Sequence, residues 1–103
     1  MKPIAFLGSS LASIRAFPTA VKREAGYELD KVQRGAGPRD WKAMPNLGPG
    51  VREIRIRIEG AWRVVYVASR ADAIYVLHAF QKKTQRTSKR DISAIQSALK
   101  EIR

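Results

Sequence analysis

A two-residue alternation in the segment 51–58, unbroken from Glu53 onward, constrains this chain more than any other feature. The apolar positions are Ile54, Ile56 and Ile58, and the charged positions are Glu53, Arg55, Arg57 and Glu59. Successive side chains of a β-strand point to opposite faces of a sheet, so this period predicts a half-buried strand with a charged outer face. The Glu59-Gly60 pair predicts a turn into a second extended segment over residues 62–68. We therefore expect a β-hairpin, in which Arg63 could lie beside Arg57.

The segments around this hairpin predict one more long strand and several helices. Residues 74–80 are apolar at nearly every position, as are residues 62–68, so both are expected to be central strands. A short first strand is expected over residues 3–7. A helical turn follows it, and then a longer helix that starts at Phe17-Pro18 and ends at Gly35.

The end of the chain predicts a final helix, because Ser88 is a suitable N-cap with Asp91 three residues later. The expected order is β-α-α-β-β-β-α. We interpret it as an α+β fold, a small antiparallel-dominated sheet with helices packed on it, in a single domain over residues 1–103. Residues 35–50 are rich in Gly and Pro and predict a surface crossover, pinned to the core by Trp41, Met44 and Leu47.

The charge of the chain indicates its class of partner. Twenty Lys and Arg face nine Asp and Glu, which gives a formal net charge of +11. Self-repulsion of this size works against compactness, so such a surface usually has a polyanionic partner. We expect contact with nucleic acid or the ribosome, with nonspecific anion binding as the alternative.

Residue types that are rare or missing exclude several kinds of site. The chain has no Cys and one His, which excludes disulfides, thiolate catalysis and a multi-histidine zinc site. The acidic residues show no close pairing of the kind that holds Mg²⁺, and no glycine-rich phosphate loop is present. We therefore expect neither a metal ion nor an organic cofactor.

No apolar run approaches the roughly 20 residues that span a bilayer. Residues 1–17 resemble a signal peptide only weakly, because Pro3 and Gly8 interrupt the apolar stretch and no convincing cleavage site follows. We expect a cytoplasmic protein with no membrane partner.

Two basic clusters are candidates for a functional site. The first is on the hairpin and consists of Arg55, Arg57 and Arg63. The second follows the last predicted strand and includes Lys82, Lys83, Gln85, Arg86 and Lys89. A loop at the end of a strand projects outward, so the second cluster could overhang the first. The simpler alternative is that both clusters are solvated and that the arginines only blunt edge-to-edge aggregation.

Such clusters suit RNA cleavage without a metal ion, in which the ribose 2′-hydroxyl attacks the adjacent phosphate. Arginine stabilises the negative phosphate through its bidentate fork. Lys82 or Lys83 could transfer a proton if neighbouring cations depress the lysine pKa. His78 is a further candidate acid or base, with a buried and hydrogen-bonded structural role as the alternative.

Three runs of the sequence resemble phage-related proteins of the RelE/ParE superfamily, the Gp49-like and HigB-like toxins. These runs cover residues 51–56, 62–66 and 77–87, and the phrase from His78 to Thr87 is the most specific. The likeness is close over the C-terminal half, whereas the N-terminal half agrees only in its helix–helix outline.

This resemblance implies a curved RelE-like sheet, cleavage of messenger RNA on the ribosome, and neutralisation by a helix-turn-helix antitoxin. By position, Arg63 resembles the arginine that contacts the scissile phosphate, Arg55 the basic residue on the preceding strand, and Lys83 a second basic position. Arg57, Gln85, Arg86 and Lys89 are then expected to bind RNA. The three tyrosines, at 27, 66 and 75, all precede the basic loop, so the general base is left unassigned.

Three functions are therefore compatible with the sequence. The first is a metal-independent, ribosome-dependent endoribonuclease toxin of a type II toxin–antitoxin system. The second is a noncatalytic gyrase inhibitor of the ParE branch, which shares the fold. The third is a nontoxic nucleic-acid-binding relic of a prophage.

Overall fold

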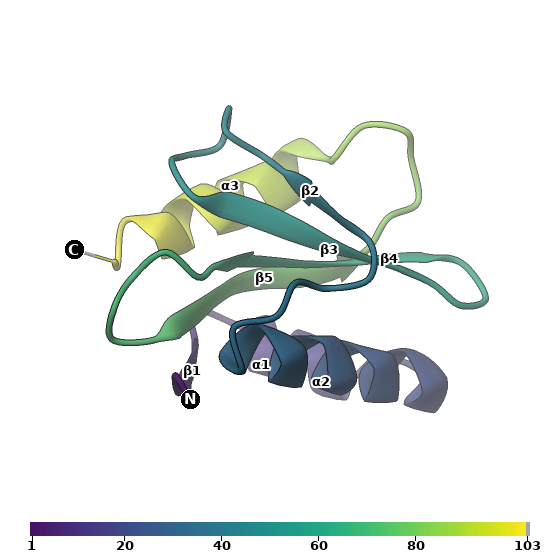
Figure 1. Ribbon diagram of the computed structural model, residues 1–103. Coiled ribbons are helices and arrows are strands. Elements are labelled where there is room, and N and C mark those ends of the chain that lie inside the picture. The colour runs from purple at the N-terminus through teal and green to yellow at the C-terminus, as the bar shows by residue number, and fades with distance from the viewer. Residues whose placement is uncertain (103) are drawn as a thin grey trace.

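A five-stranded sheet forms the centre of the protein, as the computed structural model in Figure 1 shows. The structure describes residues 1–102, so Arg103, the last residue of the predicted domain, lies outside it. In chain order the elements are β1 (Ile4–Phe6), α1 (Ser10–Arg15), α2 (Thr19–Gln33), β2 (Trp41–Ala43), β3 (Val51–Arg57), β4 (Ala61–Val67), β5 (Ile74–Gln81) and α3 (Lys89–Leu99). The strand order is β1-β5-β4-β3-β2, and only the β1–β5 pair is parallel. The predicted α+β architecture is thus confirmed, with one strand added.

The added strand, β2, lies in the segment predicted to be an irregular crossover. Its three residues pair antiparallel with β3, from Trp41 opposite Ile54 to Ala43 opposite Arg52. A strand of three residues is too short to show an alternation of apolar and polar positions. It is defined by its pairing with β3, which the local sequence does not indicate. The expected pinning holds for Met44 and Leu47, which pack against a buried cluster. Trp41 remains 40% exposed, with the Arg52 guanidinium 4.4 Å from its ring centroid.

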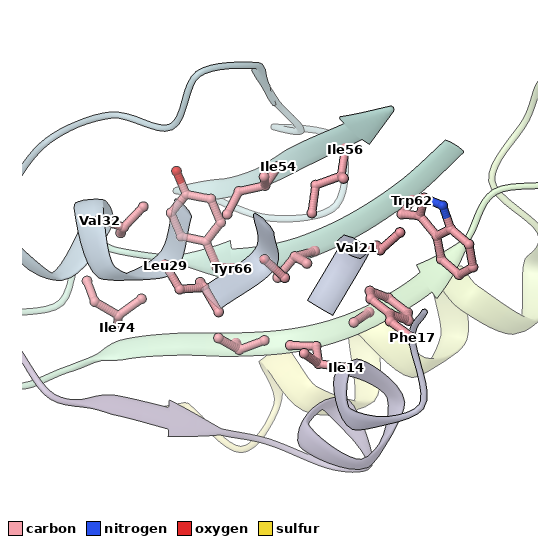
Figure 2. Packing of buried hydrophobic residues seen from close by; sticks show 14 residues of the cluster. Ile14, Phe17, Val21, Leu29, Val32, Ile54, Ile56, Trp62, Tyr66 and Ile74 are labelled. Carbon is pink, nitrogen blue, oxygen red and sulfur yellow. The ribbon is translucent and has the colours of Figure 1, made fainter. Parts of the chain in front are cut away.

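The helices lie on both faces of the sheet, with α1 and α2 on one side and α3 on the other (Figure 1). The α1/α2 side holds the larger buried cluster, which includes the inward-facing Ile54, Ile56 and Tyr66 of the sheet (Figure 2). On the opposite side, Val65, Leu77 and Phe80 pack with Ile95 of α3. Both faces of the central strands are therefore covered, which explains their nearly continuous apolar sequence.

The β3–β4 hairpin confirms the turn predicted at Glu59-Gly60, but not the predicted pairing of its arginines. Glu59 and Gly60 both have positive φ, 48° and 125°, in the loop that joins the strands. The register places Arg63 opposite Arg55 and Ala61 opposite Arg57. Arg63 is therefore directly opposite Arg55, and Arg57 is only its diagonal neighbour on the same face, because a three-residue loop over residues 58–60 sets this register.

A β-bulge interrupts β5 where it pairs with β4. Val65 is opposite His78, whereas the next residue of β4, Tyr66, is opposite Val76. Leu77 is the extra residue on the bulged strand. Because of this bulge, His78 and Phe80 lie on the α3 side of the sheet, although Ile74 and Val76 belong to the cluster on the α1/α2 side.

Helix α2 ends as the sequence predicts, at Gly35. The Gly35 N–H donates to the Val32 carbonyl and the Ala36 N–H donates to the Lys31 carbonyl, at 3.0 and 2.9 Å. With Gly35 at φ +85°, these two bonds form a Schellman motif.

Within the same helix, Gly26→Ala is expected to raise the free energy of unfolding by about 0.5–1 kcal/mol, because alanine loses less backbone entropy in a helix. A Cβ at Gly26 meets nothing within 4 Å. Urea denaturation followed by circular dichroism measures the change. Gly35→Ala is the matched control, expected to be destabilising because of the positive φ at that position. A Gly26→Ala variant no more stable than the parent contradicts the prediction.

Candidate functional site

The strand register brings the predicted basic residues together on the α3 side of the sheet. One row across the sheet consists of Arg55, Arg63 and Phe80. The row beside it, toward the middle of the sheet, consists of Glu53, Val65 and His78. A third row flanks the arginine row on the side nearer the hairpin loop, and in it Arg57 is opposite Ala61. The Lys82 N–H donates to the Ala61 carbonyl at 2.7 Å, so Lys82 extends this row. By strand alternation, Lys82 then faces the same way as Phe80.

Two of the charged residues on this face are buried, which corrects the expectation of an outer face and does not fit the alternative that both clusters are simply solvated. Glu53 is 3% exposed and Arg63 is 7% exposed, and Arg55 is half-buried. Arg63 lies on the central strand, with Arg55 and Phe80 opposite it on the two neighbouring strands. Arg57, at the end of β3, is the arginine that remains exposed, and it forms an ion pair with Asp40 at 3.4 Å.

Glu53 carries the negative charge of the cluster. Its Oε1 lies 3.2 Å from Nε of Arg63 and 3.6 Å from Nε of Arg55. Neither Nε makes a well-aligned hydrogen bond, so these contacts are ion pairs. The Nη1 atom of Arg63 donates to the Trp62 carbonyl at 3.0 Å.

Burial lowers the pKa of Arg63, since the charged guanidinium loses water. Glu53 acts in the opposite direction, whereas the neighbouring cations Arg55 and Arg57 lower the pKa further. Because the ordinary value for arginine is far above neutrality, Arg63 stays a cation at neutral pH.

His78 is held by a hydrogen-bonded chain that runs into α3. Its Nε2 lies 2.8 Å from Oδ1 of Asp91, and the ring stacks on Phe80 with the centroids 5.3 Å apart. The Ser88 hydroxyl donates to Oδ2 of Asp91 at 2.7 Å, and the Asp91 N–H donates to the Ser88 oxygen at 3.1 Å. The predicted N-cap is therefore confirmed, and it also joins the helix to the histidine.

Removal of this cap by Ser88→Ala is expected to lower the free energy of unfolding by about 1 kcal/mol, the usual cost of a lost N-cap. Ser93→Ala, in the middle of the same helix at an exposed position, is the matched control. Urea unfolding curves of both variants measure the difference. Equal midpoints for the two variants contradict the prediction.

The loop between β5 and α3 borders a cavity of about 300 Å³. Lys82, Lys83 and Arg86 line it together with Phe80 and Asp91. Of these lysines, Lys82 is half-buried and Lys83 is exposed. Gln85 and Lys89 are exposed and do not line this cavity.

The structure thus brings some predicted site residues together and separates others. Arg55, Arg63, Lys82 and His78 lie on one sheet face, and Lys83 and Arg86 line the adjoining cavity. Arg57, Gln85 and Lys89 lie at the periphery. The sequence interpretation missed Glu53 as a member of the site, although its spacing of two from Arg55 on one strand placed both on the same face.

Within residues 1–102, no cluster of three His, Asp or Glu side chains has an arrangement that could hold a metal ion. None of the described helices combines the length and the apolar character that crossing a bilayer requires.

A comparison with known protein families identifies the family of this chain. The model of the family described as phage derived protein Gp49-like (DUF891) matches residues 12–100. This range begins inside α1 and ends just after α3, so it includes β3, β4, β5 and the basic loop. No curated protein matches the chain. The protein therefore belongs to the phage-derived Gp49-like family, which is related to the RelE/HigB toxins.

Proposed function

We propose that this protein is the toxin of a type II toxin–antitoxin pair and that it cleaves messenger RNA on the ribosome without a metal ion. The observation that carries the proposal is the direct pairing of Arg55 with Arg63 across β3 and β4. Two like charges opposite each other destabilise a sheet, and Glu53 supplies only one negative charge for the two cations. The group therefore keeps a net positive charge, which suits an anionic ligand. The chain's charge of +11 and its family both support RNA as that ligand.

In the proposed reaction, the 2′-oxygen of a ribose forms a bond to the adjacent phosphorus as the bond from phosphorus to the 5′-oxygen breaks. The products are a 2′,3′-cyclic phosphate and a 5′-hydroxyl. Negative charge on the non-bridging oxygens grows in the transition state. Arg63 and Arg55 stabilise that charge, because fixed cations in a water-poor site act without reorganising.

The reaction also requires that a proton leave the 2′-hydroxyl and another reach the 5′-oxygen. His78 is suited to the first transfer. With Asp91 as a carboxylate, Nε2 of His78 donates the hydrogen bond between them, and the neutral ring then carries its lone pair on Nδ1. Lys82 or Lys83 supplies the second proton, or holds the phosphate as a further cation.

The peripheral residues are assigned to binding. Arg57, Gln85, Arg86 and Lys89 are exposed around the cluster and can contact phosphates of the messenger or of ribosomal RNA. The antitoxin, a helix-turn-helix protein, is expected to cover this face with acidic residues or an inserted helix. Action on ribosomes places the toxin in the cytoplasm.

The test is to induce the protein alone, map the 5′ ends of cellular transcripts, and assay supercoiling by gyrase with purified protein. New transcript ends with a 5′-hydroxyl, together with growth arrest, support the proposal. Growth arrest with intact transcripts overturns RNA cleavage, and inhibited supercoiling then assigns the ParE-type function. Unimpaired growth at full expression overturns toxicity.

A further inference from the structure

The carboxylate of Glu53 is out of place in a site that binds phosphate. It is 3% exposed, and its Oε1 lies within 3.6 Å of Nε atoms from two arginines. A buried anion this close to the two arginines also repels a phosphate that approaches them, and therefore weakens the binding of RNA. In a surface that only binds phosphate, such a carboxylate would lower the affinity without any compensating effect.

The contacts of Arg63 indicate what the carboxylate contributes. The guanidinium is planar, and two of its three nitrogens face protein oxygens: Nε faces Glu53 and Nη1 donates to the Trp62 carbonyl. These two contacts fix the plane of the group and leave the remaining N–H bonds for a ligand. Without Glu53, the buried cation would face Arg55 across the strand pair with no counter-charge, and the two side chains would turn apart.

We propose that Glu53 is a positioning residue for the reaction: it holds Arg63 and Arg55 in the orientation that fits the transition state, at a cost in RNA affinity. This inference rests on the proposed function. It predicts opposite effects on the two steps, because the carboxylate opposes binding of the phosphate but assists its reaction.

The experiment compares Glu53→Gln with the parent on ribosomes programmed with a short messenger RNA. Single-turnover cleavage is expected to be about 10- to 100-fold slower, the loss typical of a displaced catalytic group. Binding to ribosomes that carry a non-cleavable 2′-fluoro messenger is expected to be as tight as the parent's or tighter. Glu101→Gln is the matched control, since it removes the same charge from an exposed position just after the end of α3. It is expected to cleave at the parent's rate.

A nuclear magnetic resonance measurement follows Arg63 directly. In the parent and in Glu101→Gln, the Arg63 Nε–H proton is expected to exchange slowly with water, because the Nε atom is buried against Glu53. In Glu53→Gln the guanidinium is expected to turn, and the proton then exchanges faster. If Glu53→Gln does not fold, Glu53→Asp carries the test, since it keeps the charge and shortens the side chain.

Three results overturn the proposal: an unchanged cleavage rate, a parallel loss of binding and cleavage, or an Arg63 signal that does not change. If the parent itself cleaves no RNA, the proposed function fails. The Arg63 signal then decides alone whether Glu53 positions the arginine.

Discussion

Replacement of Arg63 by alanine is expected to slow RNA cleavage by about 10²- to 10³-fold, the usual loss when one fixed donor to a developing anion is removed. Arg63 is the most buried cation of the cluster, and its guanidinium is oriented by Glu53 and the Trp62 carbonyl. Its removal therefore takes away an interaction that water cannot replace with equal geometry. The measurement is single-turnover cleavage of messenger RNA on programmed ribosomes.

Two variants make the result interpretable. Arg63→Lys keeps the charge but lacks the planar fork, and it is expected to cleave at an intermediate rate. Arg23→Ala removes an equal charge from an exposed position on α2, which covers the opposite face of the sheet, and it is expected to leave the rate unchanged. Equal losses for Arg63→Ala and Arg23→Ala show that net charge, and not the site, governs the reaction. An unchanged rate in Arg63→Ala removes this arginine from the mechanism.

Trp62→Ala is expected to have the largest effect on stability, a loss of about 3–5 kcal/mol in the free energy of unfolding. The Trp62 ring is 8% exposed and packs on Phe17, with the centroids 4.9 Å apart (Figure 2). Its Nε1 also donates to the Ile58 carbonyl at 3.0 Å, which ties the hairpin loop to β4. Since small domains have only about 5–15 kcal/mol of stability, this variant is expected to be partly unfolded at 37 °C.

The second tryptophan supplies the control. Trp41→Ala removes an equally large ring from a position that is 40% exposed, and its expected cost is about 1 kcal/mol or less. Urea unfolding followed by far-ultraviolet circular dichroism compares the two variants without relying on tryptophan fluorescence. A smaller loss for Trp62→Ala than for Trp41→Ala contradicts the packing described for Figure 2.

Local signals in the sequence predicted the parts of the fold that depend on residues close together along the chain. The Glu59-Gly60 turn, the end of α2 at Gly35 and the Ser88 cap each depend on contacts within a few positions. β2 could not be predicted, because Trp41–Ala43 becomes a strand only through pairing with β3. The same holds for the opposition of Arg55 and Arg63, which the loop length determines.

For the candidate site, alternation correctly placed Arg55 and Arg57 on one face but could not reveal how deeply that face is covered. The burial of Glu53 and Arg63 depends on what packs over the sheet, and a period of two contains no such information. The hydrogen-bond partner of His78 could not be predicted for a similar reason. An apolar strand indicated a buried and hydrogen-bonded side chain, but its partner, Asp91, comes from a helix thirteen residues away.

The bulge at Leu77 determines the composition of the site. In an unbroken strand, His78, Phe80 and Lys82 would all point to the side of Ile74 and Val76, into the core beneath α1 and α2. The one additional residue reverses the second half of β5 and delivers an imidazole, an aromatic ring and an ammonium group to the arginines. Loss of Leu77 alone would therefore turn His78, Phe80 and Lys82 back toward the core, although every residue of the site would still be present. The site thus depends on the spacing along this strand as well as on the side chains that it carries.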